Sequence, residues 1–320
     1  MGFLKNSYFF NNKAEKKREI KRKLFSKNFE NKNKDLLREL LKIRNKILII
    51  GPHPDDVEFS TGRLILKRKG KNVFVFCMSD GRKGQEIGNY SESEFAKIRI
   101  KESQKALKLM NLNLKNVHYF MLPDQEVMNN PFIIDKMFIV IKNIKPDYVL
   151  IPPWEGAHPD HDATHLFSVI SLKNLMFDFN KIVEYGSYNY YQGRMNVQKF
   201  IPKNSVEFKL YPDKELQKKW SSIMKLFKSQ VSLQKKYVPK SFFECYRLLP
   251  KYDYSKLPYE NSYILRDLLN PIYPLAKKIF PKKTLMFYET WNNINPMNVK
   301  KKLFFNKKHY TNLVKSFDNK

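Results

Sequence analysis

The chain has 320 residues, 42% of them hydrophobic, and it carries 60 Lys and Arg against 31 Asp and Glu. This length permits one substantial α/β domain, and no run approaches the ~20 apolar residues that a membrane helix needs. The first residues, Met1 to Lys5, lack the apolar core and small-residue cleavage site of a signal peptide. Two cysteines give no disulfide framework, so a reducing, cytoplasmic location is expected.

The formal net charge of +29 is concentrated at the two ends. Residues 1–46 hold 15 Lys and Arg against 5 Asp and Glu, and residues 271–320 hold 11 against 2. Such an excess favours attraction to a polyanion: phospholipid headgroups, a phosphorylated substrate or nucleic acid. The alternative is compositional drift in a chain rich in Lys, Asn, Ile and Phe. No recognisable nucleic-acid module accompanies the charge.

A charged helix is predicted over residues 13–44, with an apolar stripe in its second half. From residue 46 the pattern alternates between apolar runs and helical segments. The predicted strands are 46–51, 72–78, 117–120, 147–151, 182–188, 197–201, 205–210 and 242–248. The predicted helices are 57–69, 92–110, 131–144, 163–175 and 213–235. Strands that alternate with helices of this length indicate a doubly wound, mostly parallel Rossmann-like sheet with helices on both faces.

Three parts of the chain are distinguished by this pattern. Residues 1–45 are predicted to be a basic helical extension, residues 46–250 the α/β domain, and residues 251–320 a basic, aromatic-rich C-terminal extension. Within the last part, residues 263–287 mix apolar side chains with paired lysines and three prolines. The preferred interpretation of that mixture is a tail packed on the core with its lysines outward, and the alternative is a peripheral membrane segment.

Two similar phrases follow two of the predicted strands. They are His53-Pro54-Asp55-Asp56 and His158-Pro159-Asp160-His161, and each stands where a strand gives way to a helix. In open α/β sheets, ligands bind beyond the carboxyl ends of the strands, at a topological switch point. If the two strands are neighbours, imidazoles and carboxylates from both loops meet at one edge of the sheet.

Two imidazoles and one carboxylate suit a catalytic zinc, which leaves a position for water. The Asp55-Asp56 pair offers one carboxylate to the metal and a second one to accept a proton from water that attacks a carbonyl. The remaining imidazole would stabilise the oxyanion or protonate the leaving amine. Asp160 is placed to orient His158 and to raise its pKa. His165, four residues after His161, is either a competing ligand or a packed side chain.

These phrases resemble those of the PIG-L/LmbE-like deacetylases, zinc-dependent hydrolases that remove an acetyl group from N-acetylglucosaminyl compounds. The resemblance covers about residues 46–250 and extends to three further features. These are the glycine-containing loop with Arg82, the Arg-x-x-Glu of Arg99 and Glu102, and the acidic turn at Asp124. Members of the family often carry a Tyr just before the second phrase, where this chain has Trp154-Glu155-Gly156.

The resemblance implies a role for each matching residue. Zn²⁺ would be held by His53, Asp56 and His161, although a His/His/Asp site also accepts other divalent transition metals. Asp55 would be the general base, and His158 the acid and oxyanion partner held by Asp160. The last implied set comprises the substrate-binding residues Arg82, Arg99 and Asp124.

The function that follows is hydrolysis of the N-acetyl group of an amino-sugar conjugate, by zinc-activated water with Asp55 as base. Two alternatives remain: an amidase that acts on another amide through the same site, and a basic protein that binds anionic surfaces or nucleic acid on a retained scaffold. The expected partner is an N-acetylated sugar substrate, and a lipid-linked or phosphorylated form of that sugar is an option. The expected location is cytoplasmic, with peripheral contact to an anionic membrane as an option. The sequence does not indicate an oligomeric state.

Overall fold

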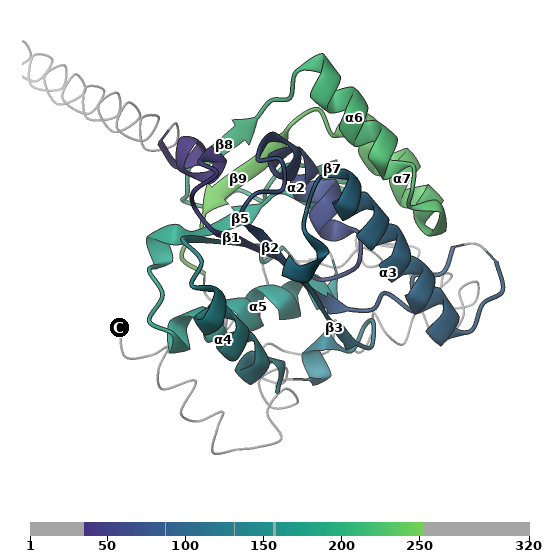
Figure 1. Ribbon diagram of the computed structural model, residues 1–320, viewed down its shortest axis with the longest axis horizontal. Coiled ribbons are helices and arrows are strands. Elements are labelled where there is room, and N and C mark those ends of the chain that lie inside the picture. The colour runs from purple at the N-terminus through teal and green to yellow at the C-terminus, as the bar shows by residue number, and fades with distance from the viewer. Residues whose placement is uncertain (1–34, 87, 131, 156–157, 253–320) are drawn as a thin grey trace, which may run out of the picture.

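A computed structural model describes residues 35–86, 88–130, 132–155 and 158–252 (Figure 1). Most of the predicted N-terminal extension and nearly all of the predicted C-terminal extension, including the mixed segment at 263–287, lie outside the described residues. Residues 35–41 are helical, as predicted for that stretch, and bury Leu36 and Leu40 against the main core.

Seven strands form one sheet in the order β3-β2-β1-β4-β5-β9-β8. The strands are β1 (Ile47–Gly51), β2 (Val73–Ser79), β3 (Val117–Leu122), β4 (Tyr148–Ile151), β5 (Ile182–Tyr185), β8 (Glu207–Leu210) and β9 (Glu244–Leu248). The pairings from β3 to β5 are parallel, whereas β9 runs antiparallel to both β5 and β8. The chain moves outward from β1 through β2 and β3, then returns to β4 on the other side of β1. The topological switch point therefore lies between β1 and β4.

Helices cover both faces of this sheet (Figure 1). One face carries α4 and α5, and the other carries α2, α3 and α6, with α7 following α6. The helices are α2 (Asp56–Lys67), α3 (Glu92–Leu109), α4 (Ile133–Ile144), α5 (Pro159–Asn174), α6 (Lys214–Met224) and α7 (Val231–Tyr237). Short 3-10 turns are η1 (Leu114–Asn116), η2 (Val127–Asn129), η3 (Phe179–Lys181), η4 (Tyr191–Gly193), η5 (Lys228–Gln230) and η6 (Val238–Lys240). The predicted doubly wound, mostly parallel architecture is confirmed.

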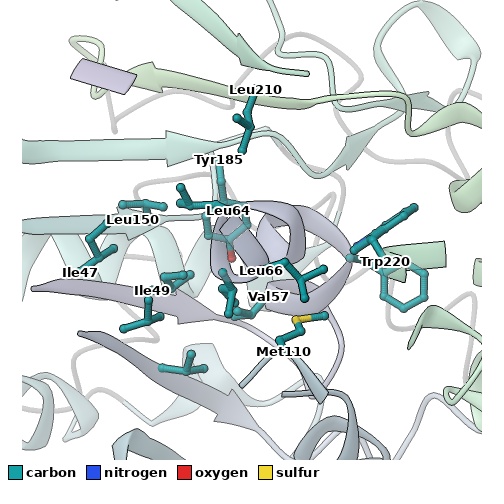
Figure 2. Packing of buried hydrophobic residues seen from close by; sticks show 14 of the residues in the cluster. Ile47, Ile49, Val57, Leu64, Leu66, Met110, Leu150, Tyr185, Leu210 and Trp220 are labelled. Carbon is teal, nitrogen blue, oxygen red and sulfur yellow. The ribbon is translucent and has the colours of Figure 1, made fainter. Parts of the chain in front are cut away.

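Strand β1 shows why two cores form. Ile47 and Ile49 belong to the cluster under α2, while Leu48 and Ile50 belong to the cluster under α4 and α5. Successive side chains of a strand point to opposite faces, so a fully apolar run fits a strand that is covered on both sides. Figure 2 shows the first cluster, where strand side chains meet α2 and Trp220 of α6 packs beyond that helix.

Several predicted elements have different limits in the structure, and of the strand predicted over 197–201 only residue 197 lies in a strand. The helix predicted from residue 163 begins at Pro159, since a proline suits the first helical position and His158 serves as N-cap. The single helix predicted over 213–235 is two helices, with η5 between them. The strand predicted over 182–188 divides at Gly186 into β5 and the short β6 (Tyr188–Asn189), which pairs with β7 (Asn196–Val197) as a separate two-stranded ribbon.

No helix among the described residues is long and apolar enough to cross a membrane.

Candidate active site

The two His-Pro-Asp phrases lie side by side at the switch point. Strands β1 and β4 pair in parallel with Ile49 opposite Leu150, so the loops that follow them leave the same edge of the sheet. The imidazoles of His53 and His161 have ring centroids 5.4 Å apart, and those of His53 and His158 are 4.7 Å apart. The predicted convergence of the two loops is present in the structure.

The first loop is a tight turn held by its own side chains. The carbonyl of His53 accepts hydrogen bonds from the backbone N–H groups of Asp55 at 2.8 Å and Asp56 at 3.3 Å. Asp56 Oδ2 in turn accepts from the backbone N–H of His53 at 2.9 Å. A glycine is required just before this turn, because a Cβ at Gly51 would lie 2.6 Å from Cγ2 of Val57. These contacts fix His53 and Asp56 on the same side of the loop.

His53, Asp56 and His161 form a buried group with metal-ligand spacing. Asp56 Oδ2 lies 3.0 Å from His53 Nδ1 and 3.3 Å from His161 Nε2. His161 Nε2 makes no hydrogen bond to any residue that the structure describes, although it is buried. A buried imidazole nitrogen without a hydrogen bond, beside a carboxylate and a second imidazole, fits a divalent cation.

A second group with similar spacing shares His53 and adds His158 and Asp160. Its carboxylate is already engaged: Asp160 accepts hydrogen bonds from the backbone N–H groups of Gln125 at 2.7 Å and Val127 at 3.3 Å. His158 Nδ1 also accepts one, from the backbone N–H of Asp160 at 3.2 Å. The first group is therefore better suited to hold a metal.

Electrostatic surroundings separate the two aspartates of the first phrase. Burial favours the neutral form of each, but the imidazoles of His161 and His53 hold the pKa of Asp56 well below its ordinary value. Burial raises the pKa of Asp55, although the guanidinium of Arg99 opposes this rise. Adjacent carboxylates in one loop thus have different proton affinities, as expected for one that binds a cation and one that transfers a proton.

Arg99 lies beside Asp55 rather than at the outer part of the pocket. Its Nη2 is 2.6 Å from Asp55 Oδ2, and both side chains are 4% exposed. Its Nη1 donates to the carbonyl of Gly81 at 3.4 Å. Arg99 also lines the cavity, but the guanidinium predicted to contact the sugar is paired with the predicted base.

His158 differs from expectation in its electrostatics. The carboxylate of Asp160 points toward the backbone near residue 125 and toward His53, whose Nε2 lies 3.4 Å from Asp160 Oδ2. Asp160 therefore positions His158 through its backbone N–H and not through its carboxylate. Burial and the neighbouring His53 and His161 lower the pKa of His158 well below its ordinary value, whereas a higher pKa was expected.

Asp124 and Arg82 have different places relative to the cavity. Asp124 lines it, with Oδ1 3.2 Å from His53 Nε2 and Oδ2 accepting from the backbone N–H of Lys83 at 3.2 Å. Arg82 is not among the cavity-lining residues. Its Nε donates to Asp80 Oδ2 at 2.8 Å, and its side chain is 30% exposed. Of the nine predicted site residues, Asp160 and Arg82 do not line the cavity: Asp160 contacts His53, which does line it, whereas Arg82 pairs with Asp80.

The cavity has a volume of about 250 Å³ and reaches from the histidines to elements that the sequence did not connect with the site. Its outer wall has two parts. One is the β6–β7 ribbon, which contributes Tyr188, Tyr190 and Met195; the other is α7 with the turn before it, which contributes Gln230, Ser232, Leu233 and Lys236. The ring of Tyr188 contacts that of His161, with centroids 5.5 Å apart. The three tyrosines among residues 188–191 were the sequence feature that could have indicated an aromatic wall of the cavity.

A buried polar cluster holds this ribbon in place. Glu155 Oε2 accepts from Asn189 Nδ2 at 2.8 Å, and its Oε1 accepts from the backbone N–H of Ile201 at 2.7 Å. Burial raises the pKa of Glu155 to about 7, against the effect of Arg247. His165 lies at this cluster, with Nδ1 2.8 Å from the carbonyl of Pro152, so it is a packed histidine outside the metal-spaced groups.

Comparison with known proteins gives consistent matches. Residues 48–170 match the family model described as PIG-L: GlcNAc-PI de-N-acetylase. A diacetylchitobiose deacetylase from Thermococcus kodakarensis is 33% identical over 122 residues, which are 36% of this chain and 45% of that protein. A probable N-acetyl-alpha-D-glucosaminyl L-malate deacetylase 2 from Bacillus subtilis is 29% identical over 129 residues, 38% of this chain and 58% of that protein. The chain thus spans about half the length of the curated relatives that it matches.

A solved structure shares the fold. It is a deacetylase triple mutant from the teicoplanin biosynthetic pathway, with a TM-score of 0.52 and 16% sequence identity. The alignment covers 65% of this chain and 99% of that one. At this identity the likeness concerns the fold.

Proposed function

We propose that the chain is a PIG-L/LmbE-like deacetylase, on the match of residues 48–170 to that family's model, and that it is a metal-dependent hydrolase that removes the acetyl group from an N-acetylated amino sugar. The observation that supports this most strongly is the buried group of His53, Asp56 and His161, with Asp55 beside it in the same turn. We further propose that residues 46–250 are the deacetylase domain, and that 1–45 and 251–320 are extensions of it.

His53 Nδ1, Asp56 Oδ2 and His161 Nε2 would hold Zn²⁺, or another divalent transition metal, since this donor set accepts several. When bound, the cation supplies Lewis-acid activation of water and of the substrate carbonyl. The remaining chemistry belongs to side chains of the chain itself.

Asp55 is the proposed general base. It accepts the proton of the water whose oxygen attacks the acetamide carbonyl carbon. The C–N bond then breaks, and the amine nitrogen takes up a proton, so that the products are acetate and a free amine. Arg99, 2.6 Å from Asp55 Oδ2, holds the carboxylate in place and favours its ionised form, which opposes the effect of burial on the pKa of Asp55.

His158 is the proposed oxyanion partner, and the proton that the leaving amine takes up is the one that Asp55 accepted from water. Because His158 Nδ1 accepts the backbone N–H of Asp160, a neutral ring carries its proton on Nε2. A lowered pKa keeps the ring neutral, so Nε2–H donates a hydrogen bond as charge develops on the carbonyl oxygen. The stretch in which the family often has a Tyr is Trp154-Glu155-Gly156 in this chain. Tyr188 is a tyrosine of the cavity wall that lies against His161.

We propose an N-acetylglucosaminyl-type conjugate as the substrate class, in keeping with what the relatives' names state of those proteins. Aromatic side chains at the cavity wall, Tyr188 and Tyr190, suit the apolar faces of a sugar ring, and Asp124 suits its hydroxyl groups. Lys236 at the same cavity would favour a conjugate that bears a negative charge, such as a carboxylate or a phosphate.

Acetate release and metal content, measured together, test the proposal. The purified full-length protein is loaded with Zn²⁺, its metal content is measured by mass spectrometry, and acetate is assayed with N-acetylglucosamine, diacetylchitobiose and N-acetylglucosaminyl malate. Asp55→Asn should keep the metal and lose about 10²- to 10⁴-fold in turnover. Glu126→Gln, an exposed carboxylate paired with Lys83, is the matched control and should retain activity. Absence of bound metal in the wild-type protein would refute the proposed metal-dependent hydrolysis. Full activity of Asp55→Asn would refute the role of Asp55 as general base.

A further inference from the structure

A lysine-rich surface covers the segment from the end of β8 to the start of β9. Every lysine in residues 209–242 is exposed, and the segment holds nine of them against two acidic residues. They are Lys209, Lys214, Lys218, Lys219, Lys225, Lys228, Lys235, Lys236 and Lys240. None of the nine makes an ion pair with a described residue, whereas Lys42 and Lys83 do. We call this set the lysine surface.

Three lysines of the lysine surface share one side of α6. Lys214, Lys218 and the C-cap residue Lys225 recur at i, i+4 and i+11, which is one face of a helix, while Trp220 and Ile223 on the other side are buried. Lys219 of the same helix is also exposed but does not share that face. Helix α3, which covers the same face of the sheet, carries five basic residues and three glutamates, and its net charge equals that of α6 with three lysines and one glutamate. The excess of positive charge is therefore a property of residues 209–242 as a whole and not of α6 alone.

Exposed aromatic side chains lie at one end of the lysine surface. Tyr211 is 64% exposed and Phe242 is 67% exposed. Both adjoin Phe243, whose ring lies 5.5 Å from that of Tyr211 and 4.3 Å from Nζ of Lys209. Large apolar rings surrounded by lysines are typical of surfaces that sit at the boundary between water and the headgroups of a bilayer.

The other end of the lysine surface reaches the candidate active site. Lys236 and Leu233 of α7 line the cavity. Strand β8 runs parallel to β5, because each is antiparallel to β9, so Tyr211 follows a strand end at the same edge of the sheet as the two histidine loops. Figure 1 shows α6 and α7 as consecutive helices along one border of the molecule. The segment that carries the lysines thus includes both the exposed aromatic pair and part of the cavity wall.

We propose that the lysine surface docks the protein on an anionic lipid membrane, with Tyr211 and Phe242 inserted among the headgroups. Charge complementarity supports this occupant, since each lysine near an anionic bilayer contributes to binding. The aromatic pair is suited to insertion among headgroups. Aromatic rings also stack on the bases of a single-stranded nucleic acid, so binding to RNA is the competing outcome of the test. Docking in this way brings the cavity next to the membrane surface, where a lipid-linked substrate would be presented.

Vesicle cosedimentation of the full-length protein tests the docking directly. Vesicles of phosphatidylcholine alone are compared with vesicles that also contain phosphatidylglycerol. The wild type should bind the anionic vesicles and not the neutral ones. The triple variant Lys214→Gln/Lys218→Gln/Lys225→Gln should lower the partition coefficient on the order of 100-fold, at about fivefold per lysine. The double variant Tyr211→Ser/Phe242→Ser should weaken binding with an unchanged salt dependence.

The matched control is Lys101→Gln/Lys105→Gln/Lys108→Gln on α3, which removes the same charge from exposed positions of another helix. It should bind nearly as the wild type does. Equal losses in the two triple variants, or absence of wild-type binding to anionic vesicles, would overturn the proposal. Loss of RNA binding but not of vesicle binding in the α6 variant would overturn it as well. Vesicle binding requires no turnover, so a failure to bind vesicles would not contradict the proposed hydrolase activity. Absence of hydrolase activity would likewise not contradict the proposed docking.

Discussion

Substituting Arg99 by Gln separates two roles for this residue. The sequence predicts that Arg99 contacts the sugar, whereas the structure pairs its guanidinium with Asp55 at 2.6 Å, both groups buried. Unit charges about 4 Å apart interact by about 4 kcal/mol at an effective dielectric constant of ~20, which equals about 3 pKa units. Loss of an adjacent cation typically raises the pKa of a carboxyl by about 1–3 units.

The sign of the effect on activity follows from the role of Asp55 as base. Burial already raises its pKa, and removal of Arg99 raises it further, so the carboxyl stays protonated to higher pH. We expect the acid limb of the kcat/KM profile of Arg99→Gln to move upward by about 1–3 pH units. Activity should recover at alkaline pH, while the zinc content is unchanged.

The assay is acetate release measured across pH with the zinc-loaded protein. Arg82→Gln serves as the control, because Arg82 pairs with Asp80 and does not line the cavity. Its profile should match that of the wild type. If Arg99→Gln left the pH profile of kcat/KM unshifted and raised KM, the pairing with Asp55 would not be the functional role of Arg99. That result would support the predicted contact between Arg99 and the substrate.

Three further predictions concern stability and the metal. Burial raises the pKa of Glu155 to about 7 in the folded protein, so folding takes up a proton at pH values between the unfolded pKa of ~4.5 and ~7. The free energy of unfolding should therefore fall by up to about 3 kcal/mol as the pH rises through that window. Glu155→Gln should remove this slope from the Tm-versus-pH curve, and an unchanged slope would contradict the assignment. Gly51→Ala should cost about 1–3 kcal/mol in denaturant unfolding, since its Cβ would meet Val57 at 2.6 Å; wild-type stability would show that the loop yields freely. His161→Ala should lose zinc affinity on chelator titration, and unaltered affinity would exclude Nε2 as a ligand.

The apolar pattern of the sequence was sufficient for the architecture around the site. Strand β1 is apolar at every position from Ile47 to Ile50, which indicates a strand covered on both faces, and the two His-Pro-Asp phrases mark two such strand exits. Their convergence follows from the rule that parallel strands end at one edge. Eight of the nine predicted site residues line the cavity or contact residues that line it, for this reason.

Other contacts were not predictable because they depend on tertiary pairing. The carboxylate of Asp160 points to the turn near residue 125, a contact across 35 positions that no local pattern reveals. The pairing of Arg99 with Asp55 spans 44 positions, and the packing of α7 against the cavity depends on a break in a segment predicted to be one helix. Local periodicity predicts which faces are buried, but not which of several carboxylates a given guanidinium or imidazole meets.

Anomalous X-ray diffraction at the zinc edge, from crystals of the zinc-loaded protein, tests the central claim most directly. We expect one strong peak within ~2.0–2.2 Å of His53 Nδ1, an Asp56 carboxylate oxygen and His161 Nε2, the range of zinc–nitrogen and zinc–oxygen bonds. Asp55 should lie beside that peak without binding to it. A peak held instead by His53, His158 and Asp160, or no peak near these histidines, would contradict the proposed division between residues that hold the metal and residues that move protons.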